Sequence, residues 1–174
     1  MRDIWLRTAR LGFSRWTEAD LPLAEALWGD PRVARYLCAA GVFAPAGIAA
    51  RLRAEIENEQ TRGIQYWPLF LRADGAFAGC CGLRPAAEPE TLELGVHLLP
   101  ACWGRGLARE AAEAVIARAF GPLGAKRLRA GHHPDNGASR RLIEGLGFRP
   151  VGAVLYAPTG RMHPTYELTP ADRR

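Results

Sequence analysis

Apolar residues recur along the chain with two different spacings, and each spacing predicts one type of element. Ile48, Leu52 and Ile56 lie four residues apart, which predicts a helix that buries one side and ends by Gly63. From Thr91 to Leu99, apolar residues alternate with other residue types, which predicts a strand. Its two expected faces carry Leu92, Leu94, Val96 and Leu98 on one side and Glu93, Gly95 and His97 on the other.

Turn and capping residues mark the remaining elements. Thr17 and Asp20 begin a helix in a capping-box-like pattern, and Asp74-Gly75 is a strong hairpin signal between two strands. The other expected strands cover residues 8–13, 66–71, 77–83, 126–132, 151–157 and 164–168; further helices follow Gly106 and Asn136, and residues 29–31 and 41–45 are expected loops. The order β-α-α-β-β-β-α-β-α-β-β predicts an α/β or α+β sheet with helices on both faces.

Composition narrows the class of protein. The chain has 174 residues, of which 48% are hydrophobic and 24% charged, so residues 1–174 are expected to form one domain with a sizeable core. No apolar run approaches the ~20 residues of a membrane helix, and the first residues lack the apolar region of a secretory signal. We therefore expect a cytoplasmic protein. Its net charge of +5 is spread over single arginines, which favours anionic ligands and predicts neither nucleic acid nor a membrane as partner.

The cysteine and histidine spacings predict no metal site. The four cysteines contain no C-x-x-C pair, and Cys80 and Cys81 would point to opposite faces of a strand. We expect all four thiols to be reduced. His132, His133 and His163 lack the i, i+4 spacing that places two imidazoles on one side of a helix.

A glycine-containing turn opens the alanine-rich helix that follows the alternating strand. In Trp103-Gly104-Arg105-Gly106 the glycines let backbone N–H groups approach an anion, and the helix N-terminus adds partial positive charge. The pattern fits neither a P-loop nor a dinucleotide fingerprint, because Arg109 stands where the fingerprint has glycine. A pyrophosphate site and a ligand-free turn both remain compatible with these residues.

Ser139 lies on or beside the apolar face of the last predicted helix. It precedes Leu142, Ile143 and Leu146 by three, four and seven residues. Asn136 is a good N-cap for this helix. A hydroxyl at this place either contacts a ligand or bonds back to the preceding turn.

Taken together, several of these segments resemble the GNAT acetyltransferase superfamily. They are the strand Leu92-Glu93-Leu94-Gly95-Val96-His97-Leu98, the turn and helix start Trp103-Gly104-Arg105-Gly106-Leu107-Ala108-Arg109-Glu110-Ala111, and Asn136-x-x-Ser139 with Leu146-Gly147-Phe148. The start of the chain, Leu6-Arg7-Thr8-Ala9-Arg10-Leu11 through Asp20 to Asp30-Pro31-Arg32-Val33, is similar to the RimJ/RimL-type branch of ribosomal-protein N-acetyltransferases and their relatives. The resemblance spans nearly the whole chain and implies a mixed, mostly antiparallel sheet that splays in its middle.

The resemblance also implies acetyl-coenzyme A as the acetyl donor. The strand over residues 94–99 would offer backbone groups to the pantetheine arm and the thioester, and the amides of residues 105–109 would hold the pyrophosphate. Trp103 replaces the glutamine or arginine that is usual in the wider superfamily. The implied cofactor-binding residues are His97, Leu98, Leu99, Trp103, Gly104, Arg105, Gly106, Leu107, Ala108, Arg109, Asn136 and Ser139.

Direct attack of a primary amine on a thioester needs a group or water chain that accepts the proton of the amine. Glu93 is the expected base, with His97 behind it, and water is the alternative acceptor. Ile143 stands where the wider superfamily often has a tyrosine acid. Ser139 is therefore expected to protonate the departing sulfur or only to hydrogen-bond it.

The sequence does not identify the amine that accepts the acetyl group. A protein N-terminal α-amine is one candidate, and a small-molecule amine such as a polyamine, an antibiotic or an amino acid is another. A non-catalytic acyl-CoA-binding module is a third interpretation. Tyr36, Phe43, Tyr66 and Trp67 are candidates for the wall of an acceptor pocket, with core packing as the alternative for at least half of them. The protein is expected to be a monomer or a homodimer.

Overall fold

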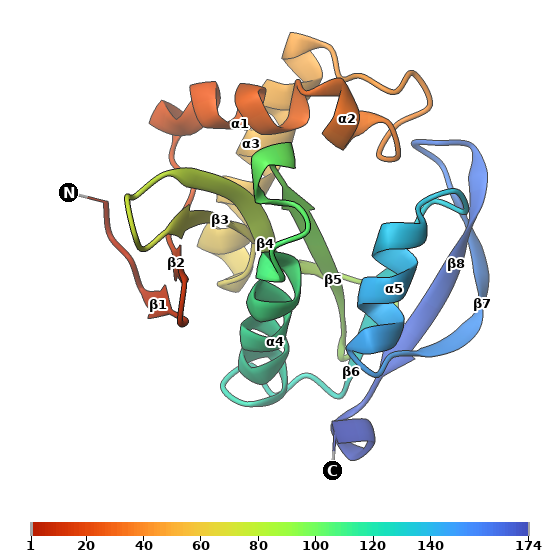
Figure 1. Cartoon of the computed structure of the whole chain (residues 1–174). Helices are drawn as coiled ribbons and strands as arrows, with labels where there is room; N and C mark the ends of the chain where they lie inside the picture. Colours follow the sequence, from red (N-terminus) through yellow and green to blue (C-terminus); the bar gives the residue numbers. More distant parts are fainter. Residues whose placement is uncertain (1, 174) are drawn as a thin grey trace.

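The chain forms one mixed sheet of eight strands with helices on both of its faces (Figure 1). The computed structural model describes residues 2–173. The strands are β1 (Leu6–Arg7), β2 (Leu11–Phe13), β3 (Tyr66–Leu71), β4 (Phe77–Pro85), β5 (Thr91–Leu98), β6 (Arg127–Gly131), β7 (Arg149–Tyr156) and β8 (Arg161–Leu168). The helices are α1 (Leu21–Trp28), α2 (Pro31–Ala34), α3 (Pro45–Arg62), α4 (Leu107–Phe120) and α5 (Gly137–Gly145).

The strand order is β1-β2-β3-β4-β5-β6-β8-β7. Within residues 2–173, neighbouring strands are antiparallel except β5 and β6, which run parallel and are joined through α4. This is the mixed, mostly antiparallel sheet expected from the sequence. None of the helices in this part of the chain has the length and apolar character of a membrane span.

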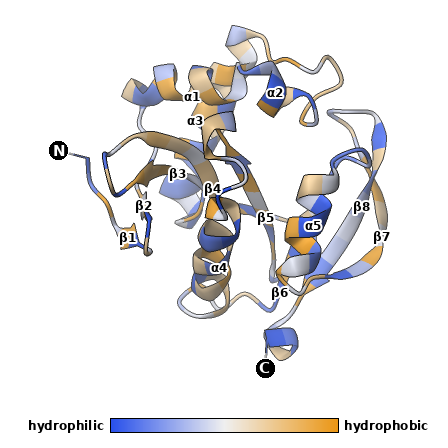
Figure 2. Cartoon of the chain, viewed as in Figure 1, coloured by the Kyte–Doolittle hydropathy of each residue, from blue (hydrophilic) through white to orange (hydrophobic). Residues whose placement is uncertain are grey.

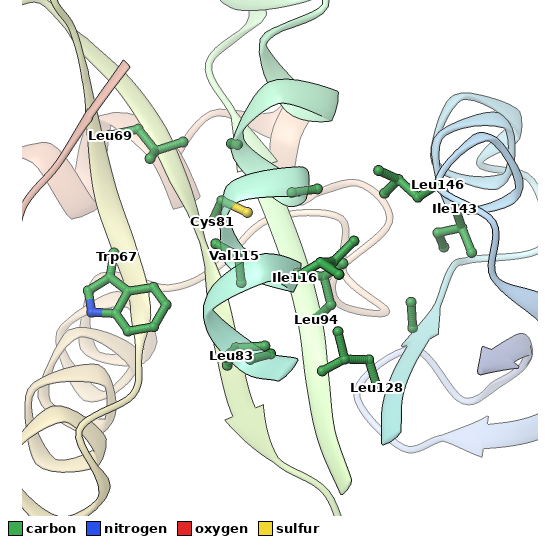
Figure 3. Close-up of a cluster of buried hydrophobic side chains, with 14 of the residues drawn as sticks. Trp67, Leu69, Cys81, Leu83, Leu94, Val115, Ile116, Leu128, Ile143 and Leu146 are labelled. Carbon is green, nitrogen blue, oxygen red and sulfur yellow. The ribbon is translucent and has the colours of Figure 1, made fainter. Parts of the chain in front are cut away.

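One face of the sheet is covered by α4 and α5. Val115 and Ile116 of α4 pack on β4 and β5. Ile143 of α5 and Leu146, the residue that follows this helix, extend the same cluster (Figure 3). The fully buried residues of α4 also include Ala111, Ala112 and Ala119. In Figure 2, α5 carries both hydrophobic and strongly hydrophilic residues, as expected of a helix with one buried side.

The other face is covered by α1, α2 and α3. Its apolar cluster includes Trp28 of α1 and Leu52 of α3. Cys80 belongs to this cluster, whereas Cys81 belongs to the cluster under α4. The expectation that these neighbouring thiols point to opposite faces is therefore confirmed, and strand alternation assigns side chains to one cluster or the other.

Most predicted elements are present, and two need correction. The first predicted strand, residues 8–13, is wrong in its first half, because the chain turns between Arg7 and Leu11 and forms a hairpin. The expected loop at residues 29–31 is only partly a loop, since Pro31 begins α2. Asp30 caps this short helix by accepting the Arg32 N–H at 2.8 Å, and a proline suits the first helical position.

The sheet splays between β5 and β6. The parallel ladder joins Thr91, Leu92 and Glu93 to Arg127, Leu128 and Arg129. Beyond Glu93, the rest of β5 keeps its pairing with β4 but has none with β6. This stretch of β5 therefore has one backbone edge that no strand of the described residues covers, as the resemblance implied.

Candidate active site

A cleft of about 760 Å³ opens at the splay. Its lining includes Glu93 on β5, Gly106 before α4, and Asn136 and Ser139 at the start of α5. Arg51 of α3 reaches the same cleft from the other face of the sheet. Residues that lie far apart in the sequence, and on both faces of the sheet, are thus brought to one cavity.

The turn before α4 presents bare backbone amides to this cleft. Gly104 has a φ of +69° and Gly106 a φ of +73°, a left-handed conformation that favours glycine. Gly106 is the N-cap of α4, and among residues 2–173 no side chain caps this helix end with a hydrogen bond. The first N–H groups of a helix lack acceptors within it, so this end of α4 can hold an anion.

The β1–β2 turn braces the anion-binding turn. Arg10 Nη1 donates to the Arg105 carbonyl at 2.8 Å, and Arg10 Nε donates to Glu110 Oε2 at 2.7 Å. The Thr8 hydroxyl and the Arg10 N–H both donate to Glu110 Oε1. Burial raises the pKa of Glu110, but these hydrogen bonds outweigh it and lower the pKa. Nothing in the sequence pattern pointed to this network.

Trp103 hydrogen-bonds the last residue of β5. Its indole N–H donates to the Leu98 carbonyl at 2.8 Å, while 48% of the residue remains exposed. The side chain that replaces the usual glutamine or arginine therefore holds the strand to the turn and offers an aromatic surface at the mouth of the cleft.

The alternation of hydrogen bonds along β5 decides which amides face the cleft. The Leu99 N–H donates to the Ala78 carbonyl at 2.9 Å, so that amide is used by the sheet. In an antiparallel ladder, every second residue points its backbone groups to the same neighbour. His97 therefore faces β4 as well, and the amides of Val96 and Leu98 face the splay. Of the predicted residues His97, Leu98 and Leu99, Leu98 is the one whose amide is directed to the cleft.

The start of α5 holds Ser139 at the cleft. Asn136 Oδ1 accepts the Ser139 N–H at 3.1 Å, which confirms Asn136 as the N-cap. Within residues 2–173 the Ser139 hydroxyl makes no hydrogen bond, so the back-bonding alternative is not observed. Ile143, one turn later, is 5% exposed and belongs to the core.

Glu93 contacts Tyr66 on the face of the sheet that α1, α2 and α3 cover. The Tyr66 hydroxyl donates to Glu93 Oε1 at 3.1 Å. Burial and the Glu93 charge raise the pKa of Tyr66 well above its ordinary value of 10.0, so the hydroxyl stays protonated and donates. The Glu93 carboxylate lines the cleft and is positioned to accept a proton there.

His97 is held as a neutral donor. The Trp28 indole N–H donates to His97 Nδ1 at 3.2 Å, so a neutral imidazole carries its hydrogen on Nε2. Burial, followed by the charges of Arg51 and Arg84, lowers the pKa of His97 well below its ordinary value of 6.5. Neither nitrogen is then a free acceptor, which disfavours a role as base behind Glu93.

Charged residues of α3 and β4 complete this side of the cleft. The Glu55 side chain is fully buried; it pairs with Arg84 and accepts the Tyr66 N–H at 2.7 Å. The Arg84 guanidinium lies 4.0 Å from the centre of the Tyr66 ring. Arg51 also lines the cleft, with its guanidinium 5.3 Å from the Trp28 ring centre.

Sequence reasoning missed these charged residues, although a signal was present. Arg51 and Glu55 lie three and seven residues after Ile48, so both fall on the apolar stripe of α3. Charged residues are almost never fully buried unless they are paired. A charge on a buried stripe is therefore a sequence signal for an internal ion pair or a ligand.

The histidines outside β5 also gather at the cleft. The rings of His133 and His163 lie 5.5 Å apart, and Tyr36 and Tyr156 stack on this pair. Burial and the neighbouring histidines lower the pKa of His163. No group of three or more metal-ligating side chains was found in the described part of the chain, residues 2–173.

The predicted aromatic residues divide between the two roles. Tyr36 and Tyr66 line the cleft. Trp67 is 1% exposed and belongs to the core under α4. Phe43 packs against the cluster of α1 and α3, with its ring centre 5.0 Å from the Arg51 guanidinium.

A splayed sheet with the uncapped N-terminus of α4 at the splay is the arrangement of the class of acyl-transferring enzymes implied by the resemblance. Residues 10–149 match the family model described as an acetyltransferase (GNAT) domain. The chain therefore belongs to the GNAT acetyltransferase family.

Relatives and solved structures agree with this membership. The chain is 28% identical over 152 residues to the uncharacterized N-acetyltransferase YoaA of Bacillus subtilis (strain 168), covering 86% of this chain and 85% of YoaA. A GNAT-family acetyltransferase structure from Bacillus anthracis superposes with a TM-score of 0.80 at 20% identity, covering 97% and 99% of the two chains. RimL, a ribosomal alpha-N-protein acetyltransferase in complex with coenzyme A, superposes with a TM-score of 0.79 at 18% identity, covering 96% and 98%. At these identities the structural likeness concerns the fold.

Proposed function

We propose that this protein transfers an acetyl group from acetyl-CoA to a primary amine by direct attack in a ternary complex. The observation that carries the proposal is one continuous cleft joining the bare N-terminus of α4 to the Glu93–Tyr66 pair. The proposal includes a cytoplasmic location for the protein and its membership of the RimJ/RimL-type branch. Likeness in fold to RimL and the branch-like start of the chain support the latter.

The reaction balances without a further reactant. The amine nitrogen forms a bond to the acetyl carbon, the bond from that carbon to sulfur breaks, and one proton passes from nitrogen to the departing sulfur. Acetyl-CoA supplies the activated thioester. The products are an N-acetyl amine and free coenzyme A thiol.

The donor side of the cleft has three tasks. The amides of residues 106–109 would bind the pyrophosphate, because they form the uncapped end of α4. The Leu98 or Val96 N–H would hydrogen-bond the thioester carbonyl and stabilise the negative charge that develops on its oxygen. The Ser139 hydroxyl, which has no partner within residues 2–173, would hydrogen-bond the sulfur.

The acceptor side has to bind the amine and remove its proton. Glu93 is the proposed proton acceptor, directly or through water, and Tyr66 orients its carboxylate. Holding amine and thioester side by side supplies a further part of the rate, because it replaces a bimolecular encounter by a fixed approach. A protein N-terminal α-amine and a small-molecule amine are both compatible acceptors at this stage.

A thiol-release assay with acetyl-CoA and a panel of N-terminal peptides, amino acids, polyamines and aminoglycosides tests the proposal. Calorimetry with acetyl-CoA alone measures donor binding separately. We expect micromolar-range donor binding and turnover with one acceptor class, with Glu93→Gln and Ser139→Ala each lowering kcat. Glu57→Gln, on the outer side of α3, is the control that leaves both measurements unchanged.

Two results would contradict the proposal. Absence of acetyl-CoA binding would exclude the acetyltransferase mechanism as a whole. Donor binding without turnover of any acceptor would favour the non-catalytic acyl-CoA-binding module instead.

A further inference from the structure

Arg51 carries a charge that the protein leaves without a counterion. Its side chain projects from α3 between the rings of Trp28 and Phe43, and its guanidinium lines the cleft. Within residues 2–173 it forms no ion pair and no hydrogen bond, and its Nε is buried without a partner. A charged group that is withdrawn from water without a partner is costly, so proteins normally pair such a group with an opposite charge or a ligand.

Glu55 and Glu93, the two acidic side chains that hydrogen-bond Tyr66, form no ion pair with Arg51. Glu55, one turn further along α3, gives both oxygens to other partners, one to Arg84 and one to the Tyr66 N–H. Glu93 accepts from Tyr66. Burial, followed by the repulsion of Arg84, lowers the pKa of Arg51, which is the direction expected for a cation without a counterion.

Arg118 provides an instructive comparison. Its Nε is also buried without a partner, and its guanidinium lies 4.4 Å from the Trp5 ring centre. It does not line the cleft. Both arginines thus contact aromatic rings, but of the two only Arg51 lines the cleft.

Arg51 and Glu93 both line the cleft, and their opposite charges indicate what kind of molecule fits. Glu93 accepts a hydrogen bond from the Tyr66 hydroxyl, and Arg51 lies close enough for its charge to oppose the rise in the pKa of that hydroxyl. His97 lines the same cleft with its ring centre 5.6 Å from that of Tyr66, and its neutral imidazole carries the hydrogen on Nε2. A ligand with an amine near Glu93 and an anionic group near Arg51 would match both charges.

We propose that Arg51 binds a carboxylate of the acetyl acceptor, so that the acceptor is a primary amine that also carries a carboxylate. The inference rests on the proposed acetyltransferase function and narrows its substrate class. A free amino acid and a protein N-terminus with an acidic side chain in its first residues share this chemistry. A polyamine lacks it.

The test compares matched acceptors that differ in one charge. Free L-amino acids are assayed against their α-carboxamides, and peptides that begin with an acidic residue against the same peptides with Asn or Gln. Charge-assisted hydrogen bonds to a guanidinium predict that the carboxylate member of a pair has about a 10- to 100-fold higher kcat/KM. The first set of pairs identifies a small-molecule source of the carboxylate and the second a protein source.

Variants of Arg51 show whether this preference comes from that residue. Arg51→Gln is expected to reduce the ratio within a pair to near one, and Arg51→Lys to keep part of it, since lysine retains the charge without the bidentate fork. The acetyl-CoA dissociation constant should stay unchanged in both. Arg118→Gln is the control for loss of a partly buried arginine outside the cleft, and circular dichroism checks that each variant folds.

The outcomes separate the two proposals. Equal kcat/KM values within every pair, or a preference that Arg51→Gln leaves intact, would overturn the role of Arg51 while the acetyltransferase function stands. Calorimetric titration of each pair into the acetyl-CoA complex covers acceptors that turn over slowly, and equal affinities there would overturn it as well. Loss of acetyl-CoA binding by the unmodified protein would instead contradict the proposed function.

Discussion

The Tyr66 hydroxyl reaches Glu93 across three strands, from β3 over β4 to β5, and donates to its carboxylate at 3.1 Å. Tyr66 is paired with Gly82, which is paired with Gly95. A Cβ on Gly95 would overlap the Tyr66 ring. The glycine on β5 therefore creates the space that lets an aromatic side chain from β3 orient the proposed base.

Coupling between Tyr66 and Glu93 can be measured with a double-mutant cycle. Tyr66→Phe removes one hydrogen bond and is expected to lower kcat about 3- to 10-fold. Glu93→Gln removes the proton acceptor and is expected to lower it about 100-fold or more. If Tyr66 acts through Glu93, Tyr66→Phe has little further effect in the Glu93→Gln background. Independent, additive losses in the steady-state rates would contradict a positioning role.

Gly106 is expected to matter for donor binding beyond its effect on stability. Gly106→Ala places a side chain at a φ of +73°, and Gly63→Ala does the same at +67° beyond the C-terminal end of α3. Each substitution should cost about 1–2 kcal/mol of unfolding free energy. Only Gly106→Ala should raise the KM for acetyl-CoA, because Gly63 lies outside the cleft lining. Equal KM values for the two variants would argue against a pyrophosphate site at this turn.

Glu110 should connect the β1–β2 turn to donor binding. Glu110→Gln weakens the acceptor of three hydrogen bonds, those from Thr8, the Arg10 backbone and the Arg10 side chain. We expect about 1–2 kcal/mol lower stability and a higher KM for acetyl-CoA, since Arg10 also holds the Arg105 carbonyl. Glu25→Gln, an exposed substitution on α1, serves as the control. A KM equal to that of the unmodified enzyme would show that the brace serves stability alone.

Stability should fall as the pH drops below about 6.5, in part because of His97. The folded protein keeps this imidazole neutral, whereas the unfolded chain binds a proton near its ordinary pKa of 6.5. Below that pH the unfolded state takes up more protons, so one such group lowers the unfolding free energy by up to about 1.4 kcal/mol per pH unit. The pKa of His163 is lowered too and contributes in the same direction.

His97→Asn isolates the contribution of His97. Asparagine keeps an acceptor for the Trp28 indole but has no proton to bind in this range. Denaturant unfolding between pH 7 and pH 5 should show a flatter pH dependence for the variant than for the unmodified protein. Identical slopes would mean that His97 is protonated in the folded state as well.

Much of the donor side could be predicted from the sequence, because its signals are local. Gly104 and Gly106 predict a turn whose backbone amides an anion can approach, and both have positive φ in the turn before α4. Asn136 predicts a cap, and it accepts the Ser139 N–H. Such features depend on neighbours within a few residues, so short-range pattern is sufficient. The misjudged strand at residues 8–13 shows the limit, since its turn is held by Glu110, about a hundred residues away.

The acceptor side was decided by tertiary structure. The sequence by itself determined the elements, the alternation that separates Cys80 from Cys81, and the family resemblance. It did not determine that the Trp28 indole hydrogen-bonds one nitrogen of His97, or that Glu55 pairs with Arg84 and not with Arg51. Nor did it determine that the Tyr66 side chain passes over two glycines to hydrogen-bond Glu93. The first two contacts join different elements through the packing of α1 and α3 on the sheet, and the third joins β3 to β5 within the sheet. The physical reason is that pairing among buried charges depends on which groups the fold brings within hydrogen-bond distance, and spacing along the chain does not encode that distance.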